Sequence, residues 1–344
     1  MSGPPTRVVN GVAPIRICDN GGWTDTWFAG HGAVFNIGVA PNAEVQIEVF
    51  EGGPPGIVLN AEDYGDRYAV QPAPPPWGPH PLLEAAVATM RVPPDLGLEV
   101  TIHSEAPKGA GTGTSAAVTV ALIGALDALT PGRLTPHEIA YTAHRIETET
   151  LGRQSGIQDQ LASAYGGINC IDIAPYPRAS VSPIRVPDSV WWELEGRLAL
   201  VYLGKSHDSS AIHEQVIRDL ENAGPEAPAL RDLRKTAWRS RDALSAGDFV
   251  ALGLAMNENT EAQARLNPAL VGTEAARVIR IAREHGALGS KVNGAGGEGG
   301  SITLLCDGHA SRKRALLRAI EADDPAFRHV PTQLSRSGVR VWTT

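Results

Sequence analysis

A glycine-rich segment at residues 107–117 has the composition of a phosphate-binding loop. It reads PKGAGTGTSAA and stands between an expected strand and an expected helix. Glycines at alternate positions let the backbone curl tightly and leave no Cβ between its amides and a ligand. The free N–H groups and the positive end of the following helix would point into the curl. The residues predicted to hold phosphate are Pro107, Lys108, Gly109, Ala110, Gly111, Thr112, Gly113, Thr114 and Ser115.

Other interpretations of this segment remain open. It is not a Walker A sequence, because no Gly-Lys-Ser/Thr closes it. Residues 111, 113 and 116 satisfy a permissive dinucleotide pattern, but a turn at 130–132 replaces the second strand that would carry an acid for a ribose. A turn that merely lets a strand and a helix pack closely is the structural alternative. A hydroxyl at the helix start can also join the shell of a magnesium ion, which prefers hard oxygen ligands.

A second glycine cluster, KVNGAGGEGG, occupies residues 291–300. It contains a literal G-x-G-x-x-G, but the apolar segment SITLLC that follows is typical of a strand, whereas a dinucleotide fingerprint must open a helix. The cluster is either a hairpin turn or a wall of bare backbone close to a ligand.

Three carboxylates have positions that suit chemistry. Asp159 stands at the start of an expected helix, where the helix N-terminus and a nearby Arg can keep it ionised; capping of that helix is the structural alternative. Glu147 and Glu149 lie near the end of the preceding helix and point in different directions. Both are expected to face solvent, unless one is a hard-metal ligand. His144, on the same helix, is expected to be exposed.

Arg16 and Asp25 flank a Gly-Gly turn in the segment RICDNGGWTD. The two residues either form a surface pair or belong to a site for a hydroxyl-rich substrate, since carboxylates accept hydrogen bonds from sugar hydroxyls.

The elements that must position these residues mix strands and helices without strict alternation, which favours an α+β fold. A proline-rich stretch at 174–189 is the expected domain boundary. Strands are expected at 34–39, 43–50, 98–104, 197–203, 301–306 and 339–342, and helices at 82–90, 115–129, 135–151, 158–165 and 310–321, with several more between 208 and 285.

Composition limits the class of protein. A chain of 344 residues suggests two domains or one large one, and 42% hydrophobic residues suffice for a globular core. The net charge of −8 argues against a nucleic-acid partner. The three cysteines are far apart, as expected for buried thiols in a reducing compartment. No segment is apolar and long enough for a signal peptide or a membrane span, so we expect a cytoplasmic protein without a membrane partner.

Three motifs in order resemble the GHMP kinase superfamily. PKGAGTGTSAA is similar to its phosphate-binding motif, with Thr112 and Thr114 in place of Leu and Ser; KVNGAGGEGG resembles its third motif, and APIRICDNGGWTDT, from Ala13, its first. Galactokinases have Glu-His where this chain has Gly22-Trp23. The segments GGWTDT, GIQDQLASAYGG and GVRVW look more like the fucokinase and heptose-7-phosphate kinase branch.

The resemblance implies a fold and an activity. Residues 1–185 would form a domain like the second domain of ribosomal protein S5, and residues 190–344 a ferredoxin-like domain, with the site in the cleft between them. The activity would be transfer of the ATP γ-phosphate, with Mg²⁺, to a hydroxyl, the anomeric one, of a sugar or sugar phosphate such as fucose or heptose 7-phosphate. The alternatives are a kinase for a mevalonate-like or homoserine-like alcohol and a non-catalytic sugar or ATP sensor. The protein would be a monomer or a homodimer.

The resemblance also assigns residues. Asp159 would take the proton from the substrate hydroxyl with Arg16 beside it, and Ser115 and Glu147 would hold magnesium. Residues 107–115 would bind ATP. Substrate contacts would come from Gly22, Trp23, Thr24, Asp25, Asp159, His207 and Gly296. Glu298 departs from the family pattern, since a carboxylate there would repel phosphate unless it turns away.

Overall fold

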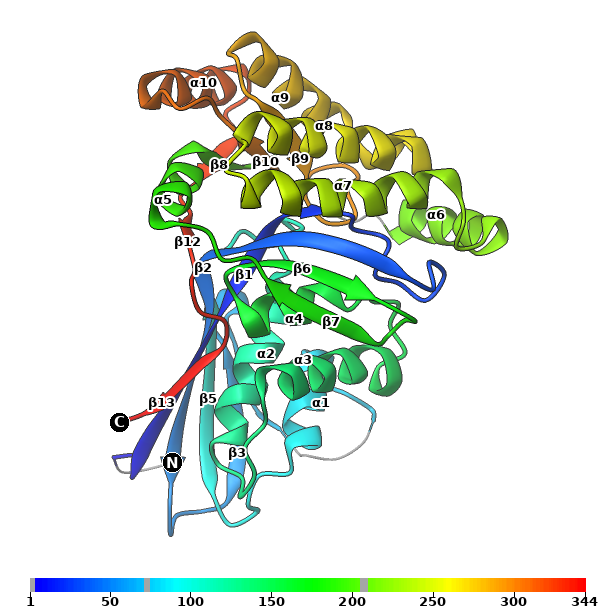
Figure 1. Ribbon diagram of the computed structural model, residues 1–344. Helices are drawn as coiled ribbons and strands as arrows, with labels where there is room; N and C mark the ends of the chain where they lie inside the picture. Colours follow the sequence, from blue (N-terminus) through cyan, green and yellow to red (C-terminus); the bar gives the residue numbers. More distant parts are fainter. Residues whose placement is uncertain (1–3, 71–74, 205–209) are drawn as a thin grey trace.

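Two β-sheets organise the chain in the computed structural model, which describes residues 4–70, 75–204 and 210–344 (Figure 1). Within these ranges the first sheet has nine strands and the second has four. Helices α1 to α4 lie below in Figure 1, and helices α6 to α10 gather around the second sheet above. The mixed α and β architecture agrees with the α+β expectation. His207, a predicted substrate contact, lies outside the described residues.

The first sheet is built on two long antiparallel strands, β1 (Arg7–Asn20) and β2 (Gly32–Phe50). Sequence patterning predicts two strands, at 34–39 and 43–50, where the structure has one. The register shifts between Pro14 and Ile15, opposite residues 39–42, so an irregularity absorbs Pro41 and the strand continues. The path order is β13-β1-β2-β5-β3-β4, with β5 at Gly97–Ser104, β3 at Gly56–Ala61 and β4 at Asp66–Val70.

Helix α2 (Thr114–Asp127) packs close to the first sheet and fixes the position of the glycine-rich loop before it. Its sequence is rich in alanine, and most of its residues are buried. A Cβ at Gly11 of β1 would lie 2.7 Å from the carbonyl oxygen of Ala121, so only glycine allows this approach. Helix α1 (Pro81–Met90) packs against α2 and agrees with the expected helix at 82–90.

The next helices carry the predicted acidic residues. Helix α3 (Pro136–Arg145) begins after Thr135, which forms a capping box with Glu138. The expected helix to residue 151 is instead α3 followed by a π-helical turn, η2 (Ile146–Thr150). Helix α4 (Gln158–Tyr165) starts where the sequence predicts it, and strands β6 (Ile168–Ile173) and β7 (Ala179–Pro183) extend the first sheet.

The second sheet is antiparallel, in the order β11-β8-β10-β9. Its strands are β8 (Leu198–Tyr202), β9 (Gly289–Val292), β10 (Ser301–Leu305) and β11 (Arg328–Val330). Helix α5 (Asp188–Arg197) precedes β8, and α10 (Ala310–Asp323) joins β10 to β11. Between β8 and β9 lie α6 (Ser210–Ala223), α7 (Pro228–Ser245), α8 (Phe249–Leu266), η3 (Pro268–Leu270) and α9 (Thr273–Glu284). Helices α7 and α8 also contact β1, which joins the two parts of the molecule.

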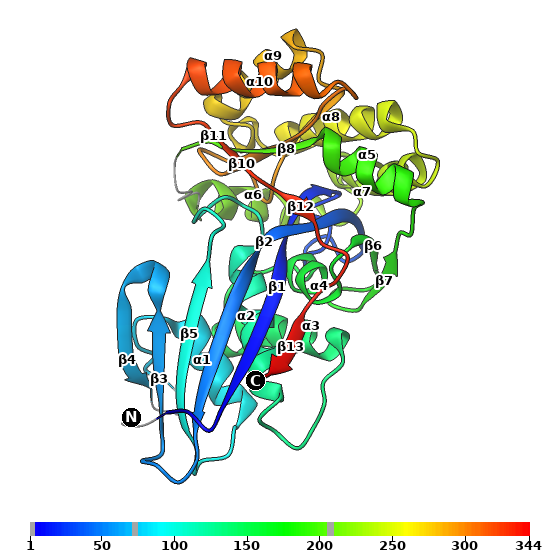
Figure 2. The ribbon, with the colours of Figure 1, turned by 90° about the vertical axis from the view of Figure 1, so that its left-hand side faces the viewer.

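The end of the chain returns to the first sheet (Figure 2). Strand β12 (Gln333–Leu334) pairs with β2, and β13 (Arg340–Thr343) pairs with β1 along the edge. The predicted second range, 190–344, therefore includes two strands of the first sheet. Periodicity identifies a strand near 339–342 but carries no information about which strand it pairs with.

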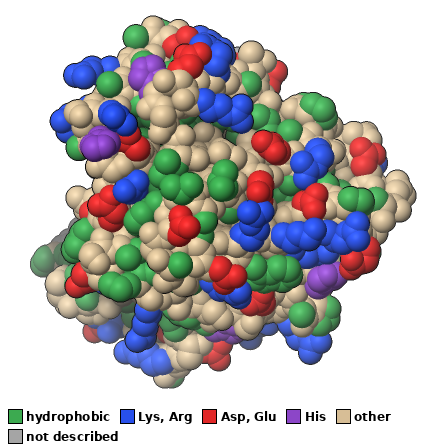
Figure 3. Space-filling view, turned by 45° about the horizontal axis from the view of Figure 1, so that its top comes forward, with side chains coloured by type: hydrophobic (Ala, Val, Ile, Leu, Met, Phe, Trp, Pro, Cys, Tyr) green, Lys and Arg blue, Asp and Glu red, His purple; other side chains and the backbone are tan. Residues whose placement is uncertain are grey.

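The surface carries both charge signs. Acidic and basic side chains are interspersed over the face in Figure 3, and many form local pairs such as Arg265 with Asp232 at 2.9 Å. No helix in the described part of the chain combines the length and the apolar character needed to cross a bilayer.

Candidate active site

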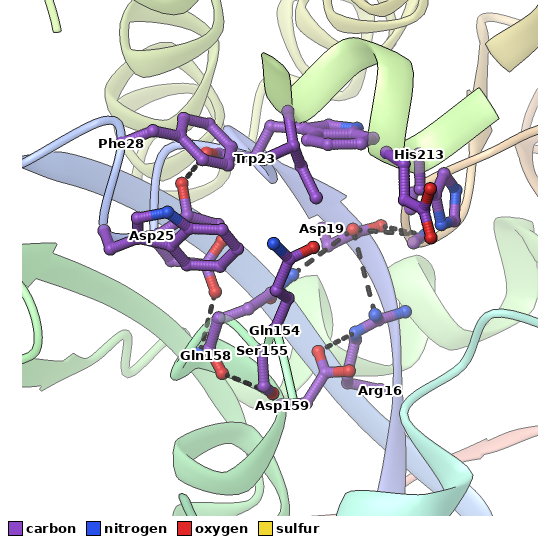
Figure 4. A pocket seen from close by; sticks show the side chains of 17 residues that line it. Arg16, Asp19, Trp23, Asp25, Phe28, Gln154, Ser155, Gln158, Asp159 and His213 are labelled. Carbon is purple, nitrogen blue, oxygen red and sulfur yellow. Dashed lines mark hydrogen bonds and ion pairs between the residues drawn. The ribbon is translucent and has the colours of Figure 1, made fainter. Parts of the chain in front are cut away.

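Arg16 and Asp159 form the centre of the site (Figure 4). Arg16 comes from β1 and Asp159 from the first turn of α4, and Nε of Arg16 donates to Oδ1 of Asp159 at 2.9 Å. The arginine is buried, whereas 31% of the Asp159 side chain is exposed. Burial alone would lower the pKa of Arg16, but the charges of Asp159 and Asp19 outweigh it and raise the pKa. The arrangement holds a carboxylate beside a permanent cation while leaving it open to a ligand.

The glycine-rich loop lies directly against this pair. Gly109, Gly111 and Gly113 have φ values of 67°, 69° and 70°, which favour glycine. A Cβ at Gly113 would lie 3.3 Å from Cγ of Asp159. The carbonyl oxygen of Gly111 accepts a hydrogen bond from Nη1 of Arg16. The loop therefore brings bare backbone to the ion pair.

Helix α2 begins at this loop with open amides. Gly113 is its N-cap residue, and no described side chain caps it. A cavity of about 270 Å³ lies over the glycine-rich loop and the start of α2; we call it the loop cavity. Its walls come from both glycine clusters, from the ion pair and from the π-helical turn: Arg16, residues 109–116, Glu147, Ser155, Asp159, Gln160, Gly294 and Ala295. Amides at a helix N-terminus beside an arginine suit a phosphate.

The second glycine cluster packs onto the first, backbone against backbone. A Cβ at Gly294 would lie 2.8 Å from the carbonyl oxygen of Gly111, and one at Gly111 would lie 2.9 Å from that of Asn293. The hydroxyl of Ser301 donates to the carbonyl oxygen of Ala110 at 2.6 Å. The cluster is the turn that joins the antiparallel strands β9 and β10, as the hairpin interpretation holds, and its bare backbone at Gly294 and Ala295 also lines the cavity. Glu298 is exposed, in contrast to its buried neighbours.

A buried network behind the ion pair was not foreseen from the sequence. Oδ1 of Asp19 lies 3.1 Å from Nζ of Lys291, and both side chains are about 1% exposed. The amide of Gly294 donates to Asp19 at 3.1 Å, and Nε2 of Gln158 does so at 3.3 Å. Asp19 therefore connects β1, β9 and α4. The presence of Asp19 and Lys291 inside the first and third motifs is the signal that could have found them.

A second cavity, of about 340 Å³, adjoins the first on the other side of the ion pair; we call it the acceptor cavity. Both cavities share Arg16, Ser155, Asp159, Gly294 and Ala295. The acceptor cavity is also lined by Trp23, Trp27, Phe28 and Ile217, and by the carboxylates of Asp19, Asp25 and Glu214. It thus offers an apolar wall and a polar wall to one ligand, beside a carboxylate that can take a proton.

Asp25 is buried at the edge of the acceptor cavity. Its Oδ2 accepts from the amide of Gln158 at 3.0 Å, which places the carboxylate at the N-terminus of α4 (Figure 4). Burial raises the pKa of Asp25 to about 6. A Cβ at Gly156 would lie 2.1 Å from Oδ2 of Asp25, so glycine is required there. The carboxylate is therefore fixed and is ionised at neutral pH.

The structure separates the predicted substrate contacts into two groups. Trp23, Asp25 and Asp159 line the acceptor cavity. Gly22, Thr24 and Gly296 are not among its described walls. Thr24 is fully buried and donates to the carbonyl oxygen of Gly21 at 2.7 Å, so it stabilises the turn. A Cβ at Gly296 would lie 2.2 Å from the carbonyl oxygen of Leu270, so this glycine permits packing behind the cavity.

A third cavity, of about 510 Å³, lies beside the glycine-rich loop and shares no lining residue with the acceptor cavity. It shares Gly109, Thr114 and Ser115 with the loop cavity. Its other walls mix rings, aliphatic side chains and cations, among them Tyr64, His80, Leu82, Lys108, Val118 and Arg153. Nζ of Lys108 lies 3.6 Å from the centre of the Tyr64 ring. Three cavities thus form a continuous series along the loop.

Oxygen ligands for a magnesium ion are available in the loop cavity. Ser115 is exposed there, and Glu147 comes from the π-helical turn. Burial raises the pKa of Glu147, and Gln160 Nε2 donates to its Oε1 at 3.0 Å. A hydroxyl and a carboxylate are hard donors of the kind that Mg²⁺ prefers alongside phosphate oxygens. No group of three or more His, Cys, Asp or Glu in the described chain is arranged to hold a metal without a ligand's help.

His144 and Tyr176 anchor the loop before α4, and the prediction that His144 is exposed is wrong. His144 is buried, not exposed, and its Nε2 lies 2.8 Å from the hydroxyl of Tyr176. That hydroxyl is also 2.9 Å from the carbonyl oxygen of Ser155, to which it donates. The pair holds the segment that carries Ser155 and leads into Asp159.

Comparisons with known proteins agree with this geometry. Residues 81–167 match the family described as GHMP kinases N terminal domain, and residues 240–322 match GHMP kinases C terminal. A D-glycero-alpha-D-manno-heptose 7-phosphate kinase from Campylobacter jejuni is 26% identical over 247 residues, which cover 72% of this chain and 71% of the relative. A mevalonate kinase from Thermococcus sibiricus is 32% identical over 253 residues, covering 71% and 69%.

Solved structures share the fold. A D-glycero-D-manno-heptose 1-phosphate kinase from Bacteroides thetaiotaomicron has a TM-score of 0.75 at 23% identity, covering 97% of this chain and 98% of that one. The galactokinase of Lactococcus lactis complexed with galactose has a TM-score of 0.75 at 17% identity, covering 98% and 96%. With both domains present in order and a relative of 32% identity matched over two thirds of its length, the chain belongs to the GHMP kinase family and is a phosphotransferase with an alcohol group as acceptor.

Proposed function

We propose that the protein transfers the γ-phosphate of ATP to a sugar hydroxyl, with magnesium. The observation that carries the proposal is the position of the Arg16–Asp159 pair, which forms a wall common to the loop cavity and the acceptor cavity. The transferred phosphoryl group and the attacking hydroxyl must meet where the two cavities adjoin, roughly in line with each other.

The three cavities suit the parts of the substrates. The third cavity, with Tyr64, His80 and Leu82, offers rings and aliphatic surface to a nucleoside. The loop and the open amides of α2 suit the phosphates, and the guanidinium of Arg16 lies where charge builds up during transfer. Ser115 and Glu147 would hold the metal, which supplies neutralisation of the phosphate charge when bound.

Asp159 is the proposed general base. Its carboxylate is partly exposed, lines both cavities and is held at 2.9 Å by Nε of Arg16. It would accept the proton of the acceptor hydroxyl as that oxygen attacks the γ-phosphorus. Asp19 and Gly113 would act through the Arg16–Asp159 pair, because Asp19 lies 4.0 Å from Arg16 and Gly113 packs against Asp159.

Sugar is the proposed acceptor because the acceptor cavity combines an aromatic wall with carboxylates. The resemblance of residues 21–26 to the fucokinase and heptose-7-phosphate kinase branch supports the anomeric hydroxyl as the reacting group. A second candidate, a mevalonate-like alcohol, is favoured by the 32% identity to a mevalonate kinase. Heptose 7-phosphate is the substrate in the name of the Campylobacter jejuni relative.

We also propose the domain folds that the motif resemblance implies. Strands β8, β9, β10 and β11 and the helices between them follow a β-α-β-β-α-β connection in the spatial order 4-1-3-2, which supports a ferredoxin-like second domain. The first sheet with α1 to α4 on it would be the domain like the second domain of ribosomal protein S5.

A screen of acceptors tests the function. The intact protein is incubated with ATP, Mg²⁺ and either free sugars, 7-phosphorylated heptose, mevalonate or homoserine, and ADP release is followed together with the phosphorylated product. Acceptor-dependent ADP release with a sugar or sugar phosphate supports the proposal. Turnover with mevalonate or homoserine alone would replace it with the second candidate.

A further inference from the structure

The described walls of the acceptor cavity carry an excess of negative charge. Four carboxylates line it, those of Asp19, Asp25, Asp159 and Glu214. The guanidinium of Arg16 is the cation among these walls, and it already contacts Asp159 at 2.9 Å and lies 4.0 Å from Asp19. Lys291 stands behind Asp19, about 1% exposed and engaged with it at 3.1 Å. Four carboxylates are thus set against two cations that are already paired.

The remaining basic side chain of these walls is also engaged. His213 packs edge-on against Trp23 with ring centres 5.5 Å apart, and its Nε2 lies 3.4 Å from the carbonyl oxygen of Gly296. The cations Lys108 and Arg153 line the third cavity and are not among the walls of the acceptor cavity. Within the described chain, these two cations therefore add no positive charge to the acceptor cavity.

The opposite wall of the acceptor cavity is apolar. The rings of Trp27 and Phe28 lie edge to face with centres 5.1 Å apart, and Trp23 and Phe28 are 6.3 Å apart. Ile217 of α6 completes this wall. The C–H face of a sugar ring packs on such a surface, while its hydroxyls remain free to reach the polar wall.

Two buried polar atoms beside the cavity have no hydrogen-bond partner among the described residues. They are Nε1 of Trp23, a donor, and Oε1 of Gln158, an acceptor. A hydroxyl can satisfy either atom, because it both donates and accepts. An ionised phosphate or carboxylate only accepts, so it would leave Gln158 unsatisfied and would also face the four carboxylates.

We infer that the acceptor is an uncharged polyhydroxy compound, a free sugar, and that acceptors bearing a phosphate or a carboxylate are poor substrates. The inference rests on the proposed kinase function and narrows its substrate class. It separates this chain from relatives whose names contain heptose 7-phosphate or mevalonate, both of which are anionic.

Matched pairs of acceptors test this inference. D-glycero-D-manno-heptose is compared with its 7-phosphate, and D-mannose with D-mannose 6-phosphate, by measuring kcat/KM for ADP release with the intact protein at saturating Mg·ATP. We expect kcat/KM to be at least about tenfold higher for the neutral member of each productive pair. Equal values, or a higher value for the phosphorylated member, would overturn the inference and leave the kinase proposal intact.

A charge-removing variant tests the electrostatic cause. Glu214→Gln removes a carboxylate at the cavity wall that is exposed and paired only loosely, at 3.6 Å, with Arg218. We expect the ratio of kcat/KM for the neutral acceptor to kcat/KM for its phosphorylated form to fall by about threefold. The effect is modest because exposed charges are screened. The matched control is Glu284→Gln, since Glu284 forms the same kind of i,i+4 pair with Arg280 on α9 and is not among the cavity walls. A preference unchanged in Glu214→Gln would count against the charge argument.

Failure of the kinase proposal would be recognised separately. If no acceptor gives turnover, calorimetric titration of the same pairs in the presence of a non-hydrolysable ATP analogue decides the question of charge. Binding of the neutral members alone supports the inference, and binding of a phosphorylated member with equal or higher affinity contradicts it.

Discussion

The ammonium of Lys291 lies 3.1 Å from the Asp19 carboxylate, and this buried pair joins the first sheet to the second. Asp19 belongs to β1, three residues after Arg16, and Lys291 belongs to β9, three residues before Gly294. Burial lowers the pKa of Lys291, while the charge of Asp19 opposes that shift. The pair therefore fixes the second glycine cluster and Arg16 relative to each other, although neither Asp19 nor Lys291 lines the loop cavity.

Removal of one partner should be costly. Lys291→Met leaves the Asp19 carboxylate buried without its cation, and we expect the free energy of unfolding to fall by about 3–5 kcal/mol. The double variant Asp19→Asn/Lys291→Met should lose less than the sum of the two single variants, because the charges then disappear together. Urea denaturation of the three variants measures this. Strictly additive losses would mean that the two groups are not coupled.

Loss of the proposed base should affect chemistry more than binding. We expect Asp159→Asn to lower kcat by about two orders of magnitude or more, the scale of general-base catalysis, with the Kd for ATP within a few-fold of the wild-type value. Steady-state kinetics and nucleotide titration provide the two quantities. Asp188→Asn, at an exposed residue paired with Arg336, is the control. Retained turnover in Asp159→Asn would reject the assignment.

The left-handed glycine next to the ion pair offers a matched comparison. Gly113→Ala would place a Cβ 3.3 Å from Asp159 and 3.4 Å from Cγ of Arg16, whereas Gly286→Ala, at a similar φ of 74°, meets nothing within 4 Å. Both variants should lose about 1–2 kcal/mol of stability from backbone strain. Only Gly113→Ala should also lose kcat/KM for ATP, by about tenfold or more. Equal kinetics in the two variants would contradict the role of this contact.

Magnesium dependence tests Ser115 and Glu147. We expect Ser115→Ala and Glu147→Gln each to raise the Mg²⁺ concentration for half-maximal activity by about tenfold, since each removes a hard oxygen donor. Glu149→Gln, two residues away and exposed, should leave the Mg²⁺ titration unchanged. A wild-type Mg²⁺ profile in both test variants would remove them from the metal site.

Acceptor binding should depend on pH through Asp25. Its pKa of about 6 means that the carboxylate is ionised above that pH and loses its charge below it. We expect KM for a neutral sugar to rise by about tenfold between pH 7.5 and pH 5, with a smaller change in KM for ATP. In Asp25→Asn, this rise in KM at low pH should be absent. If the pH profile of Asp25→Asn matches that of the wild type, another group is responsible.

The same shift has a consequence for stability. Burial raises the pKa of Asp25 in the folded protein above its ordinary value of 3.8, so the folded state binds the proton more tightly than the unfolded chain. This contribution to stability is complete below about pH 4 and is lost as the pH rises through about 6. Comparison of denaturation curves of the wild type and Asp25→Asn across this range isolates it.

Local signals in the sequence predict many elements. The helix at Gln158–Tyr165 begins at the predicted residue, and the helix expected from residue 135 begins at Pro136, because capping and periodicity depend on neighbours in the chain. The resemblance to the GHMP kinase superfamily implies that Arg16 lies beside Asp159, and in the structure Nε of Arg16 lies 2.9 Å from Oδ1 of Asp159.

Features that depend on tertiary packing could not be predicted in this way. Strand β2 continues past Pro41 because its long partner β1 accommodates an irregularity. The pair of Asp19 and Lys291 spans 272 residues, and no local pattern connects its members. His144 is buried because Tyr176, 32 residues further on, lies against it. The walls of the third cavity include Tyr64, Leu82 and Val118, which come from separate elements. No single sequence motif therefore identifies this cavity.

The pairing of β13 with β1 affects how the protein can fold during synthesis. The ribosome completes Arg340 more than three hundred residues after Val12, its partner in the register. Until then one border of the sheet that carries Arg16 has unsatisfied backbone groups, and such a border is a place where nascent chains associate. Completion of the sheet that carries Arg16 must therefore wait until residues 340–343 have left the ribosome, long after β1 and β2.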